Sequence, residues 1–194
     1  YGLAALTQNW GGVVVARWRG GDQLDALRLA AREAMAAADI VVAVGGASVG
    51  EKDLAKDAFA LPDFDLLFPR VAIKPGKPVW FGRRDRTFIL GLPGNPTLAI
   101  VTARLFLAPL LAALSGRDME EAWAWRTLRL GAALEPAGNR DSFLRATVRD
   151  TIVTPLSDQN SASQSALARA THLVRHPIGA PFLAAGSPVE ALIL

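Results

Sequence analysis

A strand, a helix, a second strand and a glycine-rich turn follow one another in the first 50 residues, and this order restricts the fold more than any other feature of the chain. Residues 13–16 are an apolar run typical of a buried strand, residues 23–38 are rich in Ala, Leu and Arg as in a helix, and residues 40–44 are a second buried strand. A glycine-rich turn begins at Gly45. This order predicts an α/β domain with a mostly parallel sheet.

The rest of the chain divides into the remainder of that domain and a small β domain. Strands at residues 79–81 and 87–90 surround a polar turn, and residues 97–114 form an apolar helix that we expect to be buried. Short alternating segments punctuated by Pro and Gly follow this helix, which is typical of a small β domain. We therefore expect an α/β domain over residues 1–118 and a β domain over residues 119–194.

The start of the chain suggests a longer protein. Residues 3–10 read as a helix that stops at Gly11-Gly12, and the strand expected before this helix is missing. The chain also opens with Tyr1 instead of Met. Both features predict that the sequence is a part of something longer.

Composition restricts the kind of ligand. The formal net charge of +3 suits an acidic small molecule, whereas a nucleic-acid partner would need a clustered basic face with interleaved aromatic residues. The absence of cysteine excludes disulfides and thiolate metal sites and fits a cytoplasmic protein. The longest apolar run, residues 98–114, contains Arg104 and Pro109 and is shorter than the ~20 apolar residues of a membrane span. We expect a small-molecule ligand and neither a nucleic-acid nor a membrane partner.

The first candidate site is the turn after residues 40–44. Ligands of open α/β sheets bind at the carboxyl ends of strands, where glycines let backbone N–H groups approach an anion. Asp53 lies just beyond the turn and could hold a metal ion or accept a hydroxyl. The same sequence would also suit a tight turn with a capping serine. The candidate binding residues of this turn are Gly45, Gly46, Ser48 and Gly50.

Lysine is confined to a second candidate region. All four lysines fall between residues 52 and 77, whereas the seventeen arginines are spread over the whole sequence. Lys74 and Lys77 flank Pro75-Gly76, which fixes one backbone position and frees the next, so two compact ammonium groups are held near one loop. Arg70 could add charge to the same place. This loop suits a phosphate or another oxyanion, and two solvated surface lysines would produce the same pattern.

A third turn, Gly91 to Pro96, ends a strand and opens the helix at residues 97–114. Pro96 fits the first helical position and Asn95 fits the N-cap. Pro93 and Gly94 precede the cap, and the exposed N–H groups beyond it would face the same ligand edge as the other two loops. The co-occurrence of three such loops favours one anionic ligand site.

Together, residues 45–53, 71–78 and 91–96 closely resemble the molybdopterin molybdenumtransferase family, which includes the C-terminal half of the animal protein gephyrin. The order and spacing of the motifs match, and the resemblance covers essentially the whole chain. It implies a three-layer α/β domain of the molybdopterin-binding type, followed by a small β-barrel-like domain.

The resemblance implies an enzyme of molybdenum cofactor biosynthesis. Such enzymes take adenylylated molybdopterin and molybdate, insert the metal into the dithiolene and release AMP with the help of Mg²⁺. Asp22 and Asp53 match the family's functional acidic residues, which would hold the cation and handle the adenylyl phosphates. Lys74 matches a functional lysine. Pro93 and Pro96 match the prolines that shape the molybdate and pterin loops.

The resemblance also implies partners. Full-length relatives complete the active site across a homodimer, and the adenylyltransferase of the same pathway is a further expected partner. Arg70 stands where many relatives carry a second lysine, so the charge is kept while the amine is not.

Two other functions fit parts of the sequence. A related molybdopterin adenylyltransferase shares the α/β domain, but the β domain after residue 120 argues against it. A non-catalytic pterin-binding or scaffold module is the other alternative, and the presence of Asp22, Asp53 and Lys74 argues against it.

Overall fold

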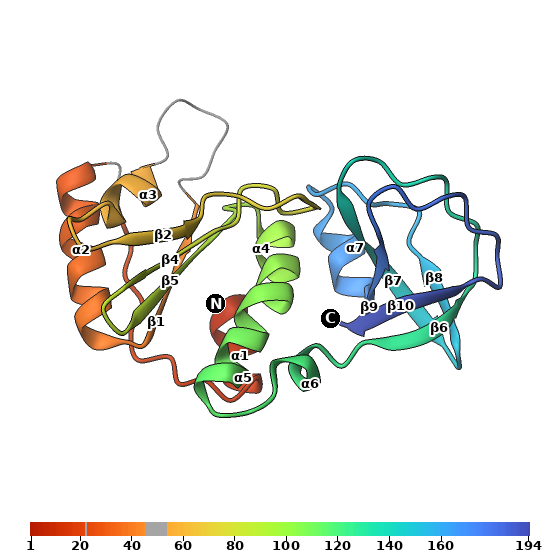
Figure 1. The fold of residues 1–194 in the computed structure, drawn as a ribbon, viewed down its shortest axis with the longest axis horizontal. Coiled ribbons are helices and arrows are strands. Elements are labelled where there is room, and N and C mark those ends of the chain that lie inside the picture. Colours follow the sequence, from red (N-terminus) through yellow and green to blue (C-terminus); the bar gives the residue numbers. More distant parts are fainter. Residues whose placement is uncertain (22, 46–53) are drawn as a thin grey trace. The chain divides into compact units, whose positions relative to one another are not determined.

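The structure, a computed structural model, describes residues 1–21, 23–45 and 54–194 and contains two compact units (Figure 1). Unit 1 comprises residues 1–71 and 78–103, and unit 2 comprises residues 72–77 and 104–194. This division falls earlier in the chain than the boundary that the sequence predicts, and it assigns a short internal segment to the second unit.

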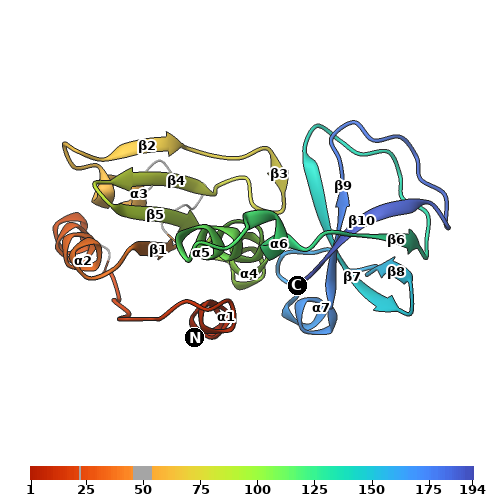
Figure 2. The ribbon, with the colours of Figure 1, turned by 60° about the horizontal axis from the view of Figure 1, so that its bottom comes forward.

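Unit 1 is built on a four-stranded mixed sheet, whose strands lie side by side in Figure 2. The sheet order is β1-β5-β4-β2, with β1 parallel to β5 and the other neighbouring pairs antiparallel. The strands are β1 (Ile40–Val44), β2 (Asp65–Phe68), β4 (Trp80–Arg84) and β5 (Thr87–Leu92).

The expectation of a mostly parallel sheet is therefore not confirmed, and the three-layer arrangement stays a prediction. The reason is the polar turn between β4 and β5. Only Asp85 and Arg86 separate the two strands, and Asp85 has a φ of 51°. A two-residue connection can join only antiparallel strands, because a parallel pair needs a crossover of a dozen or more residues.

The strand expected at residues 13–16 is also wrong. This segment belongs to no helix or strand in the described part of the chain, and Val13 and Val15 are 84% and 58% exposed. An apolar run supplies strand propensity, but a strand forms only where a neighbour pairs with its backbone groups. Local sequence could not reveal whether such a neighbour is present.

The helices expected on either side of that segment are confirmed as α1 (Gly2–Asn9) and α2 (Leu24–Ala37). The short helix α3 (Leu54–Phe59) follows β1 in the described chain. Helices α2 and α3 cover one face of the sheet, where Ala31, Phe59 and Trp80 belong to one apolar cluster. Trp80 is fully buried at the centre of the cluster.

Two glycines make room for the aromatic rings of this face. A β-carbon on Gly91 would overlap the Trp80 indole, and one on Gly82 would overlap the ring of Phe64. Phe64 packs edge-on against Trp80 with ring centroids 6.3 Å apart, and Phe59 packs at 5.8 Å. Gly91 is the first residue of the third candidate turn and lies one residue before the end of β5, so this packing fixes the strand end from which that turn departs.

One continuous helical run connects β5 to the second unit. It consists of α4 (Pro96–Thr102), a π-helical turn η1 (Ala103–Leu107) and α5 (Ala108–Leu114), which confirms the predicted helix. At 19 residues it is long and apolar enough to cross a membrane, so the expectation that it is too short for this is wrong. Most of it is buried within the protein, which is the behaviour of a core helix in a soluble protein.

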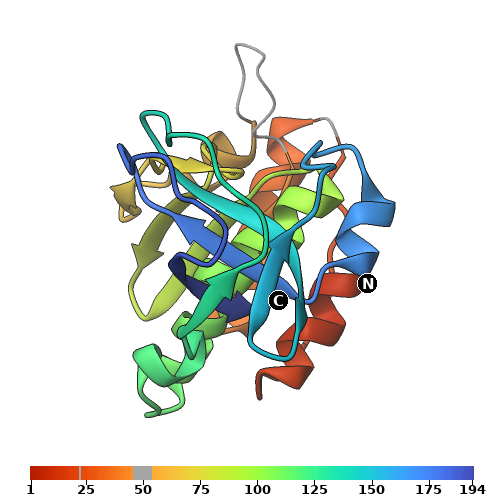
Figure 3. The same ribbon diagram turned by 90° about the vertical axis from the view of Figure 1, so that its right-hand side faces the viewer.

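Unit 2 is a small closed β-barrel, whose green-to-blue strands face the viewer in Figure 3. The strand order is β3-β7-β8-β6-β10-β9, and an additional pairing of β7 with β9 closes five of the strands into the barrel. Leu130, Val153 and Val174 are among the buried residues of its interior. The strands are β3 (Ile73–Lys74), β6 (Arg126–Leu130), β7 (Asp141–Arg149), β8 (Ile152–Pro155), β9 (His172–His176) and β10 (Pro188–Ile193). The predicted small β domain is thus confirmed.

A buried arginine holds the π-helical turn in unit 2. Arg104 is 7% exposed; its Nε donates to the Ile193 carbonyl at 2.7 Å and its Nη2 donates to the Trp123 carbonyl at 3.2 Å. Trp123 lies at the end of α6 (Met119–Trp123), and its indole N–H donates back to the Leu105 carbonyl at 2.9 Å. Burial lowers the pKa of Arg104 from its ordinary value. The turn is therefore tied to both α6 and the last strand.

The fit between Gly91 and Trp80 yields a testable prediction. A Gly91→Ala substitution should lower the free energy of unfolding by about 1–3 kcal/mol, because the added methyl group must displace a fully buried indole. Gly21→Ala is the control in the same unit, since a β-carbon there would meet no atom of the described residues within 4 Å. Urea denaturation of both variants measures the difference, and equal midpoints would contradict the packing described.

Candidate functional site

Two of the predicted loops meet at the carboxyl end of the parallel strand pair in unit 1. Val44 and Leu92 are opposite each other in the register of β1 and β5, and the Gly45 N–H donates to the Leu92 carbonyl at 3.1 Å. A β-carbon built on Gly94 would lie 3.0 Å from the Gly45 Cα. The two loops therefore lie backbone to backbone, and the contact leaves no room for a larger residue at position 94 without a shift.

The start of α4 completes this arrangement. Asn95 is the N-cap, and its Oδ1 accepts a hydrogen bond from the Leu98 N–H at 3.2 Å. Pro96 occupies the first helical turn, so both cap predictions are confirmed. Gly94 is exposed and Pro93 is buried beside it. A capped helix start next to glycine backbone is an environment in which N–H groups and the helix dipole favour an anion.

The lysine loop belongs to unit 2. Strand β3 pairs in parallel with β7 and places Lys74 opposite Ser142. The Lys74–Pro75 peptide is cis, and Gly76 has a φ of 121°, in the region that favours glycine. Lys74 and Lys77 are both exposed. Two ammonium groups thus stand on either side of a buried glycine, free to reach an anionic ligand.

The candidate site residues are accordingly split between the two units. Arg70 is exposed and belongs to unit 1 with the glycine and proline loops, whereas Lys74 and Lys77 belong to unit 2. The predictions on Asp22 and on residues 46–53 fall outside the described residues. The residues outside the description include the predicted Mg²⁺ ligands Asp22 and Asp53 and the predicted binding residues Gly46, Ser48 and Gly50.

No alternative metal site replaces those two carboxylates within the described chain. Residues 1–21, 23–45 and 54–194 contain no group of three or more His, Asp or Glu side chains that could hold a metal ion. The magnesium site therefore stays a prediction that rests on Asp22 and Asp53.

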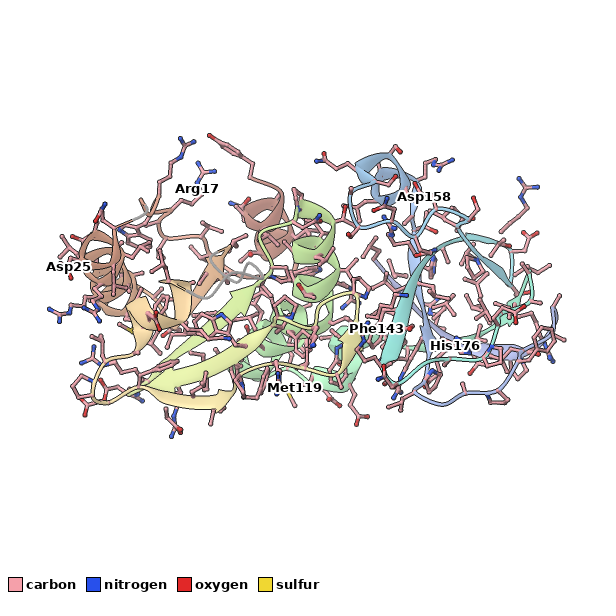
Figure 4. All side chains as sticks on the ribbon, turned by 90° about the horizontal axis from the view of Figure 1, so that it is seen from above. Arg17, Asp25, Met119, Phe143, Asp158 and His176 are labelled. Carbon is pink, nitrogen blue, oxygen red and sulfur yellow. The ribbon has the colours of Figure 1, made fainter. Side chains whose placement is uncertain are left out.

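The sequence did not single out Arg145, which organises a loop of unit 2. Arg145 is 2% exposed and lies in the middle of β7. Its Nη2 donates to the Asn160 carbonyl at 3.0 Å and the Asp158 carbonyl at 3.2 Å, and its Nη1 donates to the Ser163 carbonyl at 3.1 Å. One guanidinium thus fixes three peptide groups in the stretch before α7 (Gln164–Arg169), near which Asp158 is marked in Figure 4.

Further contacts hold the same loop. The Gln159 side chain accepts from the Arg145 N–H at 3.0 Å and donates to the Arg145 carbonyl at 2.8 Å. Hydrogen bonds from the Ser163 side chain and the Asn160 backbone hold the pKa of Asp158 below its ordinary value. Burial lowers the pKa of Arg145, and the Asp158 charge opposes this shift. The signal in the sequence was an arginine between the apolar residues Leu144 and Ala146 of a strand, where a buried charge needs partners.

Comparison with known protein families defines the class. A family described as "Probable molybdopterin binding domain" matches residues 1–113, and one described as "MoeA C-terminal region (domain IV)" matches residues 127–194. A structure of a molybdopterin biosynthesis MoeA protein from Pyrococcus horikosii superposes with a TM-score of 0.81, covering 100% of this chain and 47% of that one. At 24% identity this likeness shows the fold alone.

Individual proteins of similar sequence identify the particular family. A molybdopterin molybdenumtransferase of Synechococcus elongatus is 32% identical over 78% of this chain and 37% of its own length. Molybdopterin molybdenumtransferase 2 of Mycobacterium tuberculosis is 31% identical over 97% of this chain and 48% of its own length. The chain belongs to the MoeA family of molybdenum cofactor biosynthesis proteins. It spans about half or less of the length of these two relatives.

Arg145 gives a prediction about loop order. Arg145→Leu should lower the free energy of unfolding by about 2–3 kcal/mol, because it leaves three carbonyls of the loop without their donor. Hydrogen exchange of residues 156–163 should rise in the same variant. Arg149→Leu is the control, since Arg149 lies at the exposed end of the same strand. Unchanged exchange in Arg145→Leu would contradict the anchoring role.

His172 gives a prediction about pH. Burial, and then the charge of Arg126, lower the pKa of His172 below its ordinary value of 6.5. The unfolded chain therefore binds a proton more readily than the folded one, and stability should fall as the pH drops below about 6.5. His172→Gln should remove this part of the decline. Urea midpoints at pH 7.5 and pH 5.5 measure it, and an equal decline in wild type and variant would contradict the assignment.

Proposed function

We propose that this chain supplies the pterin-binding and C-terminal parts of a molybdopterin molybdenumtransferase, which transfers molybdenum from molybdate to adenylylated molybdopterin and releases AMP. Membership of the MoeA family supports the reaction class. The observation that carries the proposal is the contact of the Gly45 and Gly94 loops at the start of α4.

The chemistry of unit 1 suits an anionic substrate. At the edge where β1 and β5 end, glycine backbone and a capped helix start provide N–H donors without bulky side chains. A phosphate group of the pterin substrate would take its hydrogen bonds from this backbone. Pro93 is buried and Pro96 opens the helix, so both prolines hold the shape of the loop instead of touching the reacting atoms.

The chemistry of unit 2 suits a second oxyanion group. Lys74 and Lys77 are exposed on a loop whose central glycine is buried. Substrate and molybdate are both anions, and ammonium groups reduce the repulsion between them. An amine is a compact charge that can approach a tetrahedral oxyanion from many directions, whereas arginine presents a planar fork.

The proposal includes Mg²⁺ held by Asp22 and Asp53, as the family resemblance implies. Carboxylate oxygens are suitable ligands for this ion. The ion would polarise the phosphoryl oxygen at which AMP leaves. The homodimer, the adenylyltransferase partner and the cytoplasmic location belong to the same proposal.

The adenylyltransferase alternative is the weaker one. Stand-alone adenylyltransferases lack the β domain, whereas this chain has a closed barrel and matches the MoeA C-terminal region over residues 127–194. A scaffold without catalysis would not require amines at Lys74 and Lys77, so an amine-specific effect on turnover separates it from the enzyme.

The test is anaerobic release of AMP from adenylylated molybdopterin with molybdate and Mg²⁺, using the full chain. Lys74→Arg should lower the rate about tenfold or more, because the guanidinium keeps the charge but not the compact amine. Arg70→Lys is the matched control and should leave the rate nearly unchanged. Asp53→Ala should also abolish most of the release. Equal rates for wild type, Lys74→Arg and Asp53→Ala would refute the proposed site.

A further inference from the structure

One helical run passes from unit 1 into unit 2, and its regular geometry is interrupted at the crossing. The boundary between the units falls between Ala103 and Arg104, the first two residues of the π-helical turn η1. The chain also crosses between the units at residues 71–72 and 77–78, both of which lie outside helices and strands. The helical run is therefore the stiffest of these connections, and its interruption decides where the chain can bend.

Pro109 accounts for the interruption. It lies in the first turn of α5, where a proline is tolerated because the N–H that it lacks would have no helical partner. The carbonyl of Leu105, four residues earlier, consequently receives no α-helical hydrogen bond from position 109. The Trp123 indole N–H donates to this carbonyl instead, at 2.9 Å. The regular ladder of the run is thus broken at η1 and starts again in α5.

The two parts of the run are held by different units. Helix α4 packs against α1 and β5, which both belong to unit 1. At its end, the Thr102 hydroxyl donates to the Leu98 carbonyl at 2.7 Å and closes the last turn of α4. Helix α5 packs against α6 in unit 2, and Arg104 ties η1 to the same unit through the carbonyls of Ile193 and Trp123. We call Arg104 and Trp123 the clamp.

The arginine of the clamp is costly to bury. Arg104 is 7% exposed, and its Nη1 is buried without a hydrogen-bond partner among the described residues. Burying a charge costs free energy unless hydrogen bonds offset it, and an apolar residue would fill the same place without this cost. What the arginine adds is its pair of carbonyl bonds, which join η1 to α6 and to β10. Both of these elements belong to unit 2.

We propose that η1 is a hinge between the two units, and that the clamp keeps this turn and α5 with unit 2 when the hinge bends. Bending occurs between Thr102 and Arg104, where the last closed turn of α4 meets the first clamped residue. Helix α4 then moves with unit 1, while α5 and α6 move with the barrel. Hinges are typically a few residues at the ends of elements that absorb a change in backbone angles. The inference is independent of the proposed function, because it uses none of the candidate site residues.

The test measures distances between pairs of spin labels in the full chain. The sequence contains no cysteine, so labels attach only where a cysteine is introduced. Leu29 in α2, Leu67 in β2, Leu114 at the end of α5 and Ile152 in β8 are all exposed and suit this purpose. The pair 114–152 lies within unit 2, the pair 67–114 spans the hinge, and the pair 29–67 within unit 1 is the reference.

The distance distribution of the pair 114–152 should be as narrow as the reference, and that of 67–114 should be broader, since only this pair spans the hinge. Arg104→Met and Trp123→Phe each remove one part of the clamp and should broaden 114–152 while leaving 29–67 unchanged. Trp123→Phe is the more conservative variant, because it keeps an aromatic ring and removes the indole donor. Trp125→Phe is the matched control; its ring packs on Phe143, and all three distributions should stay unchanged.

Each part of the inference has an outcome that overturns it. A 67–114 distribution as narrow as the reference would refute the hinge. With the clamp intact, a 114–152 distribution as broad as that of 67–114 would show that α5 is not held by unit 2. An unchanged 114–152 distribution in both clamp variants would refute the assignment to Arg104 and Trp123. If Arg104→Met also broadens 29–67, the fold has been lost, and Trp123→Phe alone decides the result.

Discussion

The parallel pairing of β1 with β5 is the contact on which the candidate site of unit 1 depends. These strands are far apart in sequence, and only their common direction brings their carboxyl ends to one edge. Gly45 and Gly94 meet there because Val44 and Leu92 share a register. The Trp80 indole lies over Gly91 and fixes β5 just before its end. A shift of one residue in this register would turn every side chain of β5 to the other face and separate the two loops.

The sequence predicted the features that are coded locally. Asn95 and Pro96 are cap residues with strong positional preferences, and the structure confirms both. The helix at 97–114 and the small β domain were predictable for the same reason. The segment 13–16 was not, because strand propensity does not tell whether a partner strand is present. The mixed sheet was missed because the two-residue turn at Asp85 outweighs the strand–helix–strand order earlier in the chain.

Long-range burial accounts for what the sequence could not show of the site. Arg145 was one arginine among many, and its function as an anchor follows only from three carbonyls that a distant loop presents to it. The burial of His176, which is 4% exposed, follows likewise from the pairing of β9 with β7. Both residues acquire their surroundings from the tertiary fold, which a single sequence does not specify.

The segment 72–77 has a consequence for how this protein can be taken apart. The chain leaves unit 1, contributes β3 to unit 2, and returns to unit 1 before it enters unit 2 again. The second unit is therefore not one contiguous segment of the chain. A fragment that began at residue 104 would lack β3, and the backbone of Asp141 and Ser142 would have an open edge where Ile73 and Lys74 now pair. Recombination that exchanged only residues 104–194 would combine the barrel strands of one protein with the β3 segment, residues 72–77, of another. The two segments must therefore be exchanged together to keep the pairing of β3 with β7.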